Sequence, residues 1–176
     1  MLARIIEPTS KIDADQLFYC RQRGLSAEEI QKGLETFKGI KRRMEVRGVA
    51  GGVTVYDDFA HHPTAIAETL AGLRAANPHR RIWAVFEPRS ASSSRKVFQR
   101  DFARAFGPAD EVIIAPVFRT NLDESERLSP QQLVGDLTAA GQHARYAASL
   151  DDIVTVIRFS QILTGPVAPS FLGEDF

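Results

Sequence analysis

Two kinds of apolar pattern alternate along this chain from residue 26 to residue 163: apolar residues at helical spacing, and short continuous apolar runs. Apolar residues at helical spacing mark five stretches, at 26–38, 63–77, 97–106, 129–140 and 151–163. Short continuous apolar runs stand between them at 53–56, 82–86 and 112–115, with a weaker run at 143–147. Such runs are typical of strands buried on both faces. The order of elements predicts an α/β fold with a mostly parallel sheet covered by helices on both sides.

Several element ends carry recognisable local chemistry. Ser26 and Glu29 form a capping box, which predicts a helix that ends at Gly39. Pro63 suits the first turn of the next helix, and Ser129 with Pro130 gives an N-cap followed by proline. The Gly51-Gly52 pair separates two strand-like runs, which indicates either a hairpin or a strand that enters the sheet.

The two ends of the chain lack a clear period. We expect a lead-in segment at 1–38 that holds one helix, at 26–38. The α/β domain should span 39–163. The last residues, 164–176, contain two prolines and two glycines without periodicity, so they are predicted to form an irregular tail.

Composition narrows the class of protein. The 176 residues suit one ordinary domain with an extension, and 44% hydrophobic with 25% charged residues is typical of a globular protein. Lys+Arg and Asp+Glu are balanced at 22 each, so no nucleic-acid or membrane partner is expected. The single cysteine, Cys20, argues against a disulfide-stapled module. No apolar run approaches the roughly 20 residues that span a bilayer, and residues 1–24 lack a signal-peptide core, so a cytoplasmic protein is expected.

Side chains that could bind a ligand or a metal ion are clustered where the apolar run at 53–56 ends. Asp57 and Asp58 should project above the sheet, where carboxylates bind ribose hydroxyls or a cation-bound water, or else cap the next helix. His61 and His62 follow. Neighbouring side chains diverge and no third ligand stands at zinc-like spacing, so structural hydrogen bonding is expected rather than a metal site.

Two further motifs offer arginines. Lys41-Arg42-Arg43 precedes the first strand and could bind phosphate or form a solvated basic turn. Glu87-Pro88-Arg89-Ser90 ends the second buried strand, where Arg89 could receive a substrate carboxylate or serve in a helix cap with a surface ion pair. The chain has no phosphate loop and no G-x-G-x-x-G fingerprint, so any ATP chemistry needs a phosphate cradle from elsewhere.

These motifs, in this order, resemble one known family. Residues 37–45 and 55–66 resemble the start of the C-terminal domain of the Mur ligases. The His-His-Pro sequence at 61–63 is similar to the members that act on UDP-N-acetylmuramate itself. Glu87-Pro88-Arg89-Ser90 resembles the branch that adds a murein tripeptide, whereas the L-alanine-adding branch usually has Pro-His-Arg there. The resemblance covers roughly residues 24–157.

The resemblance implies a Rossmann-like three-layer fold and an ATP-dependent ligase. The carboxylate of UDP-N-acetylmuramate would be phosphorylated, and the amine of L-alanyl-γ-D-glutamyl-meso-diaminopimelate would attack the acyl phosphate, as in peptidoglycan recycling. Carried over by position, Arg43 would contact nucleotide phosphate and Asp58 the ribose, supported by Arg42 and Asp57. The incoming peptide would contact Arg89 and Ser90, supported by His61. No catalytic residue and no metal ligand is assigned to this chain.

Two departures from the family pattern complete the expectations. The family's central domain, which would bind most of the ATP and Mg²⁺, is absent from this chain, as is the N-terminal domain, so the chain should not ligate alone. After about Ile157 the match ends, and the family's last strand is expected to be missing or altered. Two alternatives stay open: a non-catalytic nucleotide- or peptide-binding domain, and the C-terminal domain of the L-alanine-adding ligase.

Overall fold

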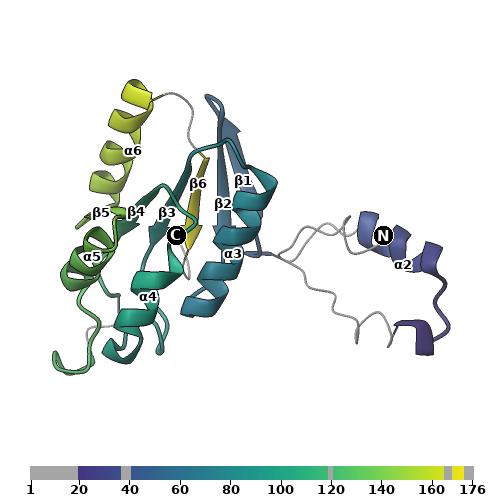
Figure 1. Cartoon of the computed structure of the whole chain (residues 1–176), viewed down its shortest axis with the longest axis horizontal. Coiled ribbons are helices and arrows are strands. Elements are labelled where there is room, and N and C mark those ends of the chain that lie inside the picture. Colours follow the sequence, from purple (N-terminus) through teal and green to yellow (C-terminus); the bar gives the residue numbers. More distant parts are fainter. Residues whose placement is uncertain (1–19, 37–40, 119–120, 165–167, 173–176) are drawn as a thin grey trace.

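A six-stranded sheet with the order β1-β2-β6-β3-β4-β5 forms the centre of the protein (Figure 1). The computed structural model describes residues 20–36, 41–118, 121–164 and 168–172. The strands are β1 (Glu45–Ala50), β2 (Val53–Asp58), β3 (Ile82–Phe86), β4 (Glu111–Ile114), β5 (His143–Tyr146) and β6 (Ala168–Leu172). The helices are α2 (Ala27–Thr36), α3 (Pro63–Ala76), α4 (Gln99–Ala105), α5 (Pro130–Ala139) and α6 (Leu150–Thr164), with a 3₁₀ turn, η2 (Lys96–Phe98), before α4. Only β1 is antiparallel to its neighbour, so the predicted, mostly parallel α/β sheet is confirmed.

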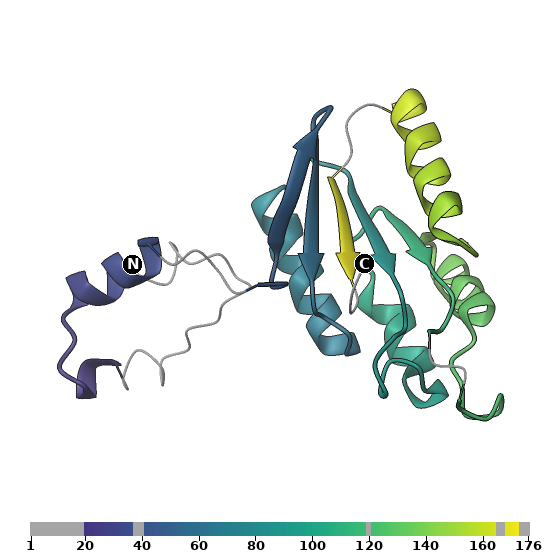
Figure 2. The same cartoon turned by 180° about the vertical axis from the view of Figure 1, so that it is seen from behind.

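The two helical layers follow from the direction in which the chain crosses the sheet. From β2 to β5 the chain advances in one direction through α3, α4 and α5, and these helices cover one face (Figures 1 and 2). From β5 it returns through α6 to β6, between β2 and β3. A right-handed crossover in the reverse direction places its helix on the opposite face. The three-layer, Rossmann-like arrangement results.

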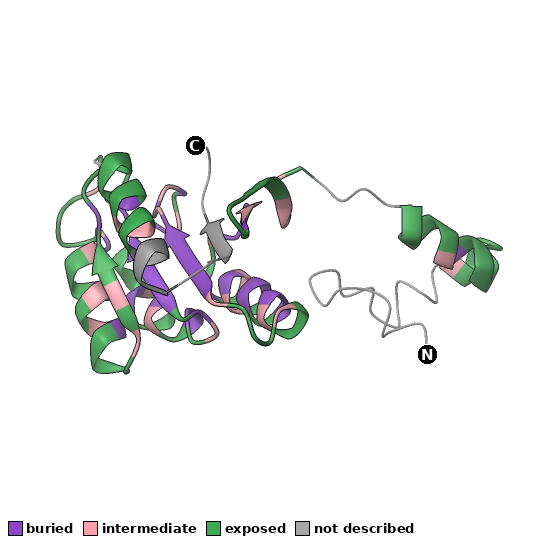
Figure 3. Ribbon diagram, turned by 90° about the horizontal axis from the view of Figure 1, so that it is seen from above, coloured by how far each residue is buried: buried purple, intermediate pink, exposed green. Residues whose placement is uncertain are grey.

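Alternation along the strands divides the core into two clusters. Ile82, Ala84 and Phe86 of β3 pack with α3, α4 and α5, and Phe86 contacts the rings of Phe102 and Phe106 at centroid distances of 5.0 and 5.5 Å. The intervening Trp83 and Val85 pack on the other face with Ile153 of α6. All five residues of β3 are buried, as the uninterrupted apolar run predicts (Figure 3).

The prediction of an irregular tail at 164–176 is wrong for residues 168–172. These residues form β6, which pairs in parallel with both β2 and β3 and so lies inside the sheet. Pro169 stands within β6, opposite Trp83. Proline is rare in a central strand, and two prolines without alternation therefore indicated a loose end. We also expected the family's last strand to be either missing or altered. The structure has a last strand, β6, so the first of these alternatives is wrong.

Most other elements match their predicted ranges. β1 and β2 form a hairpin, one of the two predicted alternatives, and Gly51 and Gly52 take φ values of 57° and 78°, as a two-residue type I′ turn requires. Ser129 caps α5 by accepting a hydrogen bond from the Gln132 amide at 3.2 Å. One helix differs: 97–106 was predicted as continuous, but η2 precedes α4 and Val97 is 73% exposed.

The helix of the lead-in segment begins as its capping box predicts. The Ser26 amide donates to the Glu29 carboxylate at 2.8 Å, and the Glu29 amide donates to Ser26 Oγ at 3.2 Å. The hydrogen bonds from Ser26 lower the pKa of Glu29. Its predicted end at Gly39 lies outside the described residues. Within the part of the chain that is described, none of the helices has the length and apolarity needed to cross a membrane.

Candidate functional site

The carboxyl ends of four parallel strands bring the predicted site segments to one edge of the sheet. Residues 59–62 follow β2, 87–90 follow β3, 115–118 follow β4 and 147–149 follow β5. This edge lies at the bottom of the sheet in Figure 2, where the arrowheads of β2, β6 and β3 point. In open α/β sheets, ligands bind outside the carboxyl ends of the strands. The edge is therefore the candidate site.

Asp58, the last residue of β2, holds the segment that leads into the sheet. Its side chain is 2% exposed, and its two oxygens accept hydrogen bonds from the amides of Met44 and Ala60, both at 2.8 Å. Burial raises the pKa of Asp58, although these two amides and the charge of Arg43 oppose the shift. Each carboxylate oxygen has a second lone pair that can accept a hydrogen bond, so the predicted contact of Asp58 with a ribose hydroxyl stays a prediction. In this arrangement Asp58 has a structural role.

Two left-handed residues flank Arg43 in the segment that Asp58 holds. Arg42 and Met44 have φ values of 59° and 50°, a region that costs non-glycine residues roughly 1 kcal/mol or more each. Besides the Asp58–Met44 bond, the Phe59 amide donates to the Arg42 carbonyl at 2.8 Å, and the Arg42 amide donates to the Glu45 carboxylate at 2.9 Å. That last bond lowers the pKa of Glu45. The bends are therefore fixed by specific hydrogen bonds.

The bends place two guanidinium groups on one aromatic ring. The Cζ atoms of Arg42 and Arg43 lie 5.7 and 5.4 Å from the centroid of Phe59. Arg42 also approaches Asp57, with Nε 3.8 Å from the carboxylate, while Arg43 is exposed. Two cations held beside each other at the end of a strand form an arrangement suited to a phosphate. Asp57, about a quarter exposed at its side chain, could accept a hydrogen bond from a hydroxyl group there.

The two histidines support this arrangement. His61 Nδ1 donates to the Phe59 carbonyl at 2.9 Å, and its ring packs edge-on against Phe59 with centroids 4.9 Å apart. His62 is the N-cap of α3, where its Nδ1 accepts from the Thr64 amide at 3.4 Å, and its ring packs against Phe98. The predicted structural role is confirmed for His62 by its capping contact. The predicted substrate contact of His61 stays a prediction.

Arg89, after β3, contacts an aromatic ring and a carboxylate. Its guanidinium carbon lies 3.8 Å from the ring centroid of Phe118, and Nη1 lies 3.5 Å from the Glu87 carboxylate. The Phe118 amide also donates to the Pro88 carbonyl at 3.1 Å, which ties the loop after β4 to the loop after β3. Burial raises the pKa of Glu87, and the charge of Arg89 opposes that shift. Stacking leaves the edge of a guanidinium able to meet a carboxylate in plane.

Ser90 belongs to a buried group of serines rather than to an open surface. Its side chain hydrogen-bonds with those of Ser92 and Ser93 at 3.1 and 2.8 Å, and its own amide donates to Ser93 Oγ at 2.9 Å. Ser90 is 7% exposed. It orders the loop that carries Arg89, and a direct contact with the incoming peptide stays a prediction.

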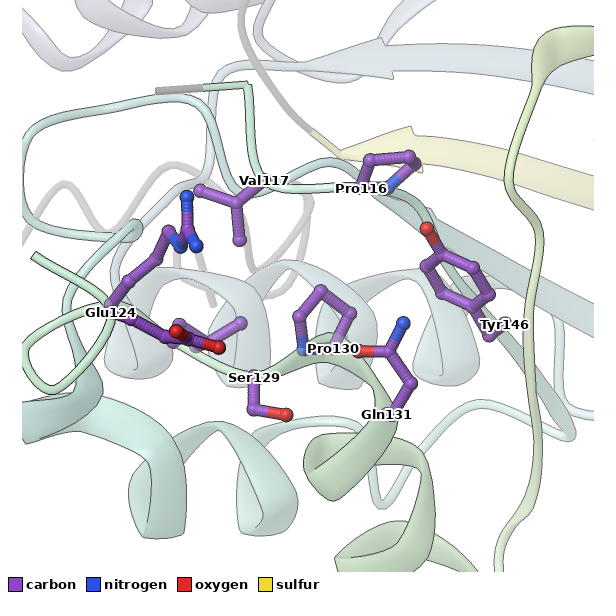
Figure 4. Close-up of a pocket in the computed structure, with 9 residues that line it drawn as sticks. Pro116, Val117, Glu124, Ser129, Pro130, Gln131 and Tyr146 are labelled. Carbon is purple, nitrogen blue, oxygen red and sulfur yellow. The ribbon is translucent and has the colours of Figure 1, made fainter. Parts of the chain in front are cut away.

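A cavity of about 300 Å³ lies between the loop after β4 and the start of α5 (Figure 4). Pro116, Val117 and Pro130 supply apolar walls, and Tyr146 and Glu124 stand at opposite sides of it. Arg127 and Gln131 complete its polar lining. Sequence reasoning missed this cavity and Phe118, because the lining combines residues from a loop, a strand and a helix that are distant in the sequence. The only signal was their position after buried strands.

The described residues contain no group of three or more His, Cys, Asp or Glu side chains that could hold a metal ion. The segment before β1 places two cations on Phe59, beside the end of β2, and the loop after β3 places one on Phe118. The edge thus has two cationic positions, at strands that are separated by β6. These positions are suited to anionic groups on one or two ligands.

Comparison with known proteins gives a consistent result. Residues 42–161 match the family described as Mur ligase, glutamate ligase domain. A UDP-N-acetylmuramate–L-alanine ligase of Desulfitobacterium hafniense is 40% identical over 142 residues, which cover 78% of this chain and 31% of that protein. The corresponding enzyme of Agrobacterium fabrum is 39% identical over 135 residues. The chain spans about a third of the length of these relatives.

Solved structures agree on the fold. A murein peptide ligase of Psychrobacter arcticus superposes with a TM-score of 0.63 at 30% identity, over 88% of this chain and 31% of that one. A domain of a tripeptide ligase of Haemophilus ducreyi, described as putative, matches at 33% identity with a TM-score of 0.53 and is covered to 89%. The Haemophilus ducreyi structure thus consists almost entirely of the region that matches this chain.

Proposed function

Because the chain belongs to the Mur ligase family and contains its C-terminal domain, we propose that it completes an ATP-dependent ligase that joins a murein tripeptide to UDP-N-acetylmuramate. The domain would meet the nucleotide with the residues after β2 and the incoming peptide with the residues after β3. ATP and Mg²⁺ would be bound mainly by a central domain that this chain does not contain.

The sequence motif at residues 87–90 carries the choice of tripeptide, and the geometry of Arg89 supports an incoming molecule with a carboxylate, a group that L-alanine also has. Arg89 stands at the carboxyl edge, stacked on Phe118 at 3.8 Å and steered by Glu87 at 3.5 Å. A fixed guanidinium recognises a carboxylate in two-point contact. The sequence Glu87-Pro88-Arg89-Ser90 resembles the tripeptide-adding branch, and two structures at 30% and 33% identity carry names from that branch.

The roles of the individual residues follow from their positions. When bound, ATP would supply the phosphoryl group that activates the carboxylate of UDP-N-acetylmuramate. Arg43 and Arg42, held on Phe59, would neutralise phosphate charge at the end of β2, and Asp57 would accept a hydrogen bond from a hydroxyl. Asp58 would keep both arginines in place through Met44. Arg89 would orient the peptide so that its amine faces the activated carboxylate.

A second candidate is the C-terminal domain of the L-alanine-adding ligase. The favouring observation is sequence identity: relatives with that name reach 40% and 39%. L-alanine is much smaller than the tripeptide. It would leave the 300 Å³ cavity beside the Arg89 loop without an occupant.

Domain exchange tests the proposal. Residues 41–176 would replace the C-terminal domain of the Psychrobacter arcticus murein peptide ligase, and ligation to UDP-N-acetylmuramate would be assayed with tripeptide and with L-alanine. Tripeptide ligation that falls at least tenfold in Arg89→Ala supports the proposal. Ligation of L-alanine in preference to tripeptide favours the second candidate.

A further inference from the structure

The cavity between β4 and β5 lies where the chain reverses its direction of crossing. The chain leaves β4 toward α5 on one face of the sheet and leaves β5 toward α6 on the other. Loops that depart to opposite faces open a crevice at the carboxyl ends of two adjacent strands. Pro116 and Val117 follow β4, and Tyr146 ends β5, so the cavity occupies this crevice (Figure 4).

The walls of the cavity are fixed by backbone hydrogen bonds. The Leu128 amide donates to the Ser94 carbonyl at 2.9 Å, and the Lys96 amide donates to the Glu126 carbonyl at 2.7 Å. The Arg127 amide donates to the Asp123 carbonyl at 3.0 Å. The loop that carries Arg127 is therefore hydrogen-bonded to the loop after β3, and it forms an ordered wall of the cavity.

Ser129, in the lining, caps α5, but four other polar side chains around the cavity make no polar contact with the described part of the fold. Within the described ranges, the side chains of Glu124, Arg127, Gln131 and Tyr146 have no hydrogen-bond or ion-pair partner. A cation, an anion, an amide and a phenol thus surround apolar walls made by two prolines and a valine. This set complements a ligand end with an ammonium group, a carboxylate and a short methylene chain.

The order of sites along the edge fixes which end of a ligand arrives here. Arg42 and Arg43 lie at β2, Arg89 at β3, and the cavity at β4 and β5. Strands lie about 4.8 Å apart, so the cavity stands about 7 Å beyond the end of β3. An extended tripeptide spans about 10 Å. Its reacting amine must face the nucleotide side, so its last residue points toward the cavity.

We propose that this cavity binds the far, zwitterionic end of the incoming peptide, the amino and carboxylate groups on the distal carbon of meso-diaminopimelate. Arg127 would pair with the carboxylate, Glu124 with the ammonium group, and Gln131 and Tyr146 would donate further hydrogen bonds. This inference rests on the proposed function, because it assumes the tripeptide as ligand. It assigns recognition of the third residue to the loop after β4.

Binding to the chain itself tests the inference. Labelled protein would be titrated with the meso-diaminopimelate tripeptide and with the same peptide carrying L-lysine, which lacks the distal carboxylate, while amide resonances are followed. We expect shifts at Val117, Gln131 and Tyr146, and a dissociation constant about tenfold higher for the lysine peptide, as the loss of one charge-assisted contact predicts. Arg127→Gln should weaken the first peptide about tenfold and leave the second unchanged. Arg158→Gln, on α6 and outside the cavity, is the matched control and should change neither.

The outcomes separate the two proposals. Shifts at Arg89 and Ser90 without shifts at the cavity, or equal affinity for both peptides, would overturn the cavity assignment and leave the proposed function intact. An absence of shifts anywhere in the protein would overturn both. A normal amide spectrum of Arg127→Gln establishes that the variant is folded.

Discussion

The Asp58 carboxylate and the Met44 amide, fourteen residues apart, are joined by a hydrogen bond of 2.8 Å. This bond connects the end of β2 to the bend that precedes β1. It holds Met44 in a left-handed conformation with φ of 50° and fixes the place where Arg42 and Arg43 meet Phe59. A buried carboxylate thus determines the position of two cations through the backbone.

Asp58→Asn should destabilise the protein by about 2 kcal/mol, since the amide group turns a donor toward one of the two backbone N–H groups. Chemical denaturation measures the free energy of unfolding. Asp57→Asn, at the neighbouring position with a 3.8 Å approach to Arg42, should cost less than about 1 kcal/mol. Equal effects of the two substitutions would argue against the anchoring role of Asp58.

The difference in stability between wild type and Asp58→Asn should depend on pH, and the sign of this dependence follows from the pKa of Asp58. Burial raises the folded-state pKa of Asp58 above its ordinary value of 3.8, so the native state binds more protons than the unfolded state above that pH. The contribution of Asp58 to the free energy of unfolding therefore falls as pH rises through the raised folded pKa. Denaturation of wild type and Asp58→Asn at several pH values from 3.5 upward should give a stability difference that shrinks with pH. A difference that grows with pH would contradict the assignment.

Phe118→Leu should release Arg89 from its stacked position. Cation–π contacts contribute about 1 kcal/mol, which corresponds to a rise of about fivefold in KM for the tripeptide. The measurement uses the domain-exchanged ligase described above, in which kcat and the KM for ATP should stay unchanged. Phe118→Tyr keeps the ring and should behave as wild type. A Phe118→Leu enzyme with unaltered tripeptide KM would rule out positioning by this ring.

Glu111, at the opposite edge of the sheet, should matter for stability alone. Its buried carboxylate pairs with Arg81 at 2.6 Å and Arg145 at 3.1 Å, and both guanidinium groups lie over the Trp83 ring. Glu111→Gln should cost about 2 kcal/mol, because a buried group then faces an arginine with a donor. Glu126→Gln breaks an exposed pair at 3.4 Å with Arg95 and should stay within about 0.5 kcal/mol of wild type. Thermal unfolding compares the two.

The sequence predicts the parts of this protein that depend on local pattern. The uninterrupted apolar run at 82–86 identifies a strand buried on both faces, and Gly51-Gly52 identifies a hairpin turn with positive φ. β6 escaped prediction because the proline in this short segment argued against a strand, whereas pairing with β2 and β3 places the segment in the sheet. Tertiary pairing overrode local preference there.

In the candidate site, too, the sequence predicts some features and not others. The sequence places Arg43, Asp58 and Arg89 at strand ends, because strand ends can be read from the pattern. It does not reveal that Asp58 is occupied by backbone amides or that Phe118 covers Arg89, since those contacts join segments 14 and 29 residues apart. Loop-to-loop contacts depend on the three-dimensional arrangement of the strands.

We propose that this domain selects a tripeptide as the incoming amine. The most direct measurement is domain exchange into a host of the other specificity, the L-alanine ligase of Desulfitobacterium hafniense, which is 40% identical over the shared region. The ratio of kcat/KM for tripeptide to that for L-alanine would be compared between host and exchanged enzyme. We expect the ratio to rise at least a hundredfold in favour of tripeptide. An exchanged enzyme that ligates L-alanine with the ratio of its host would contradict it.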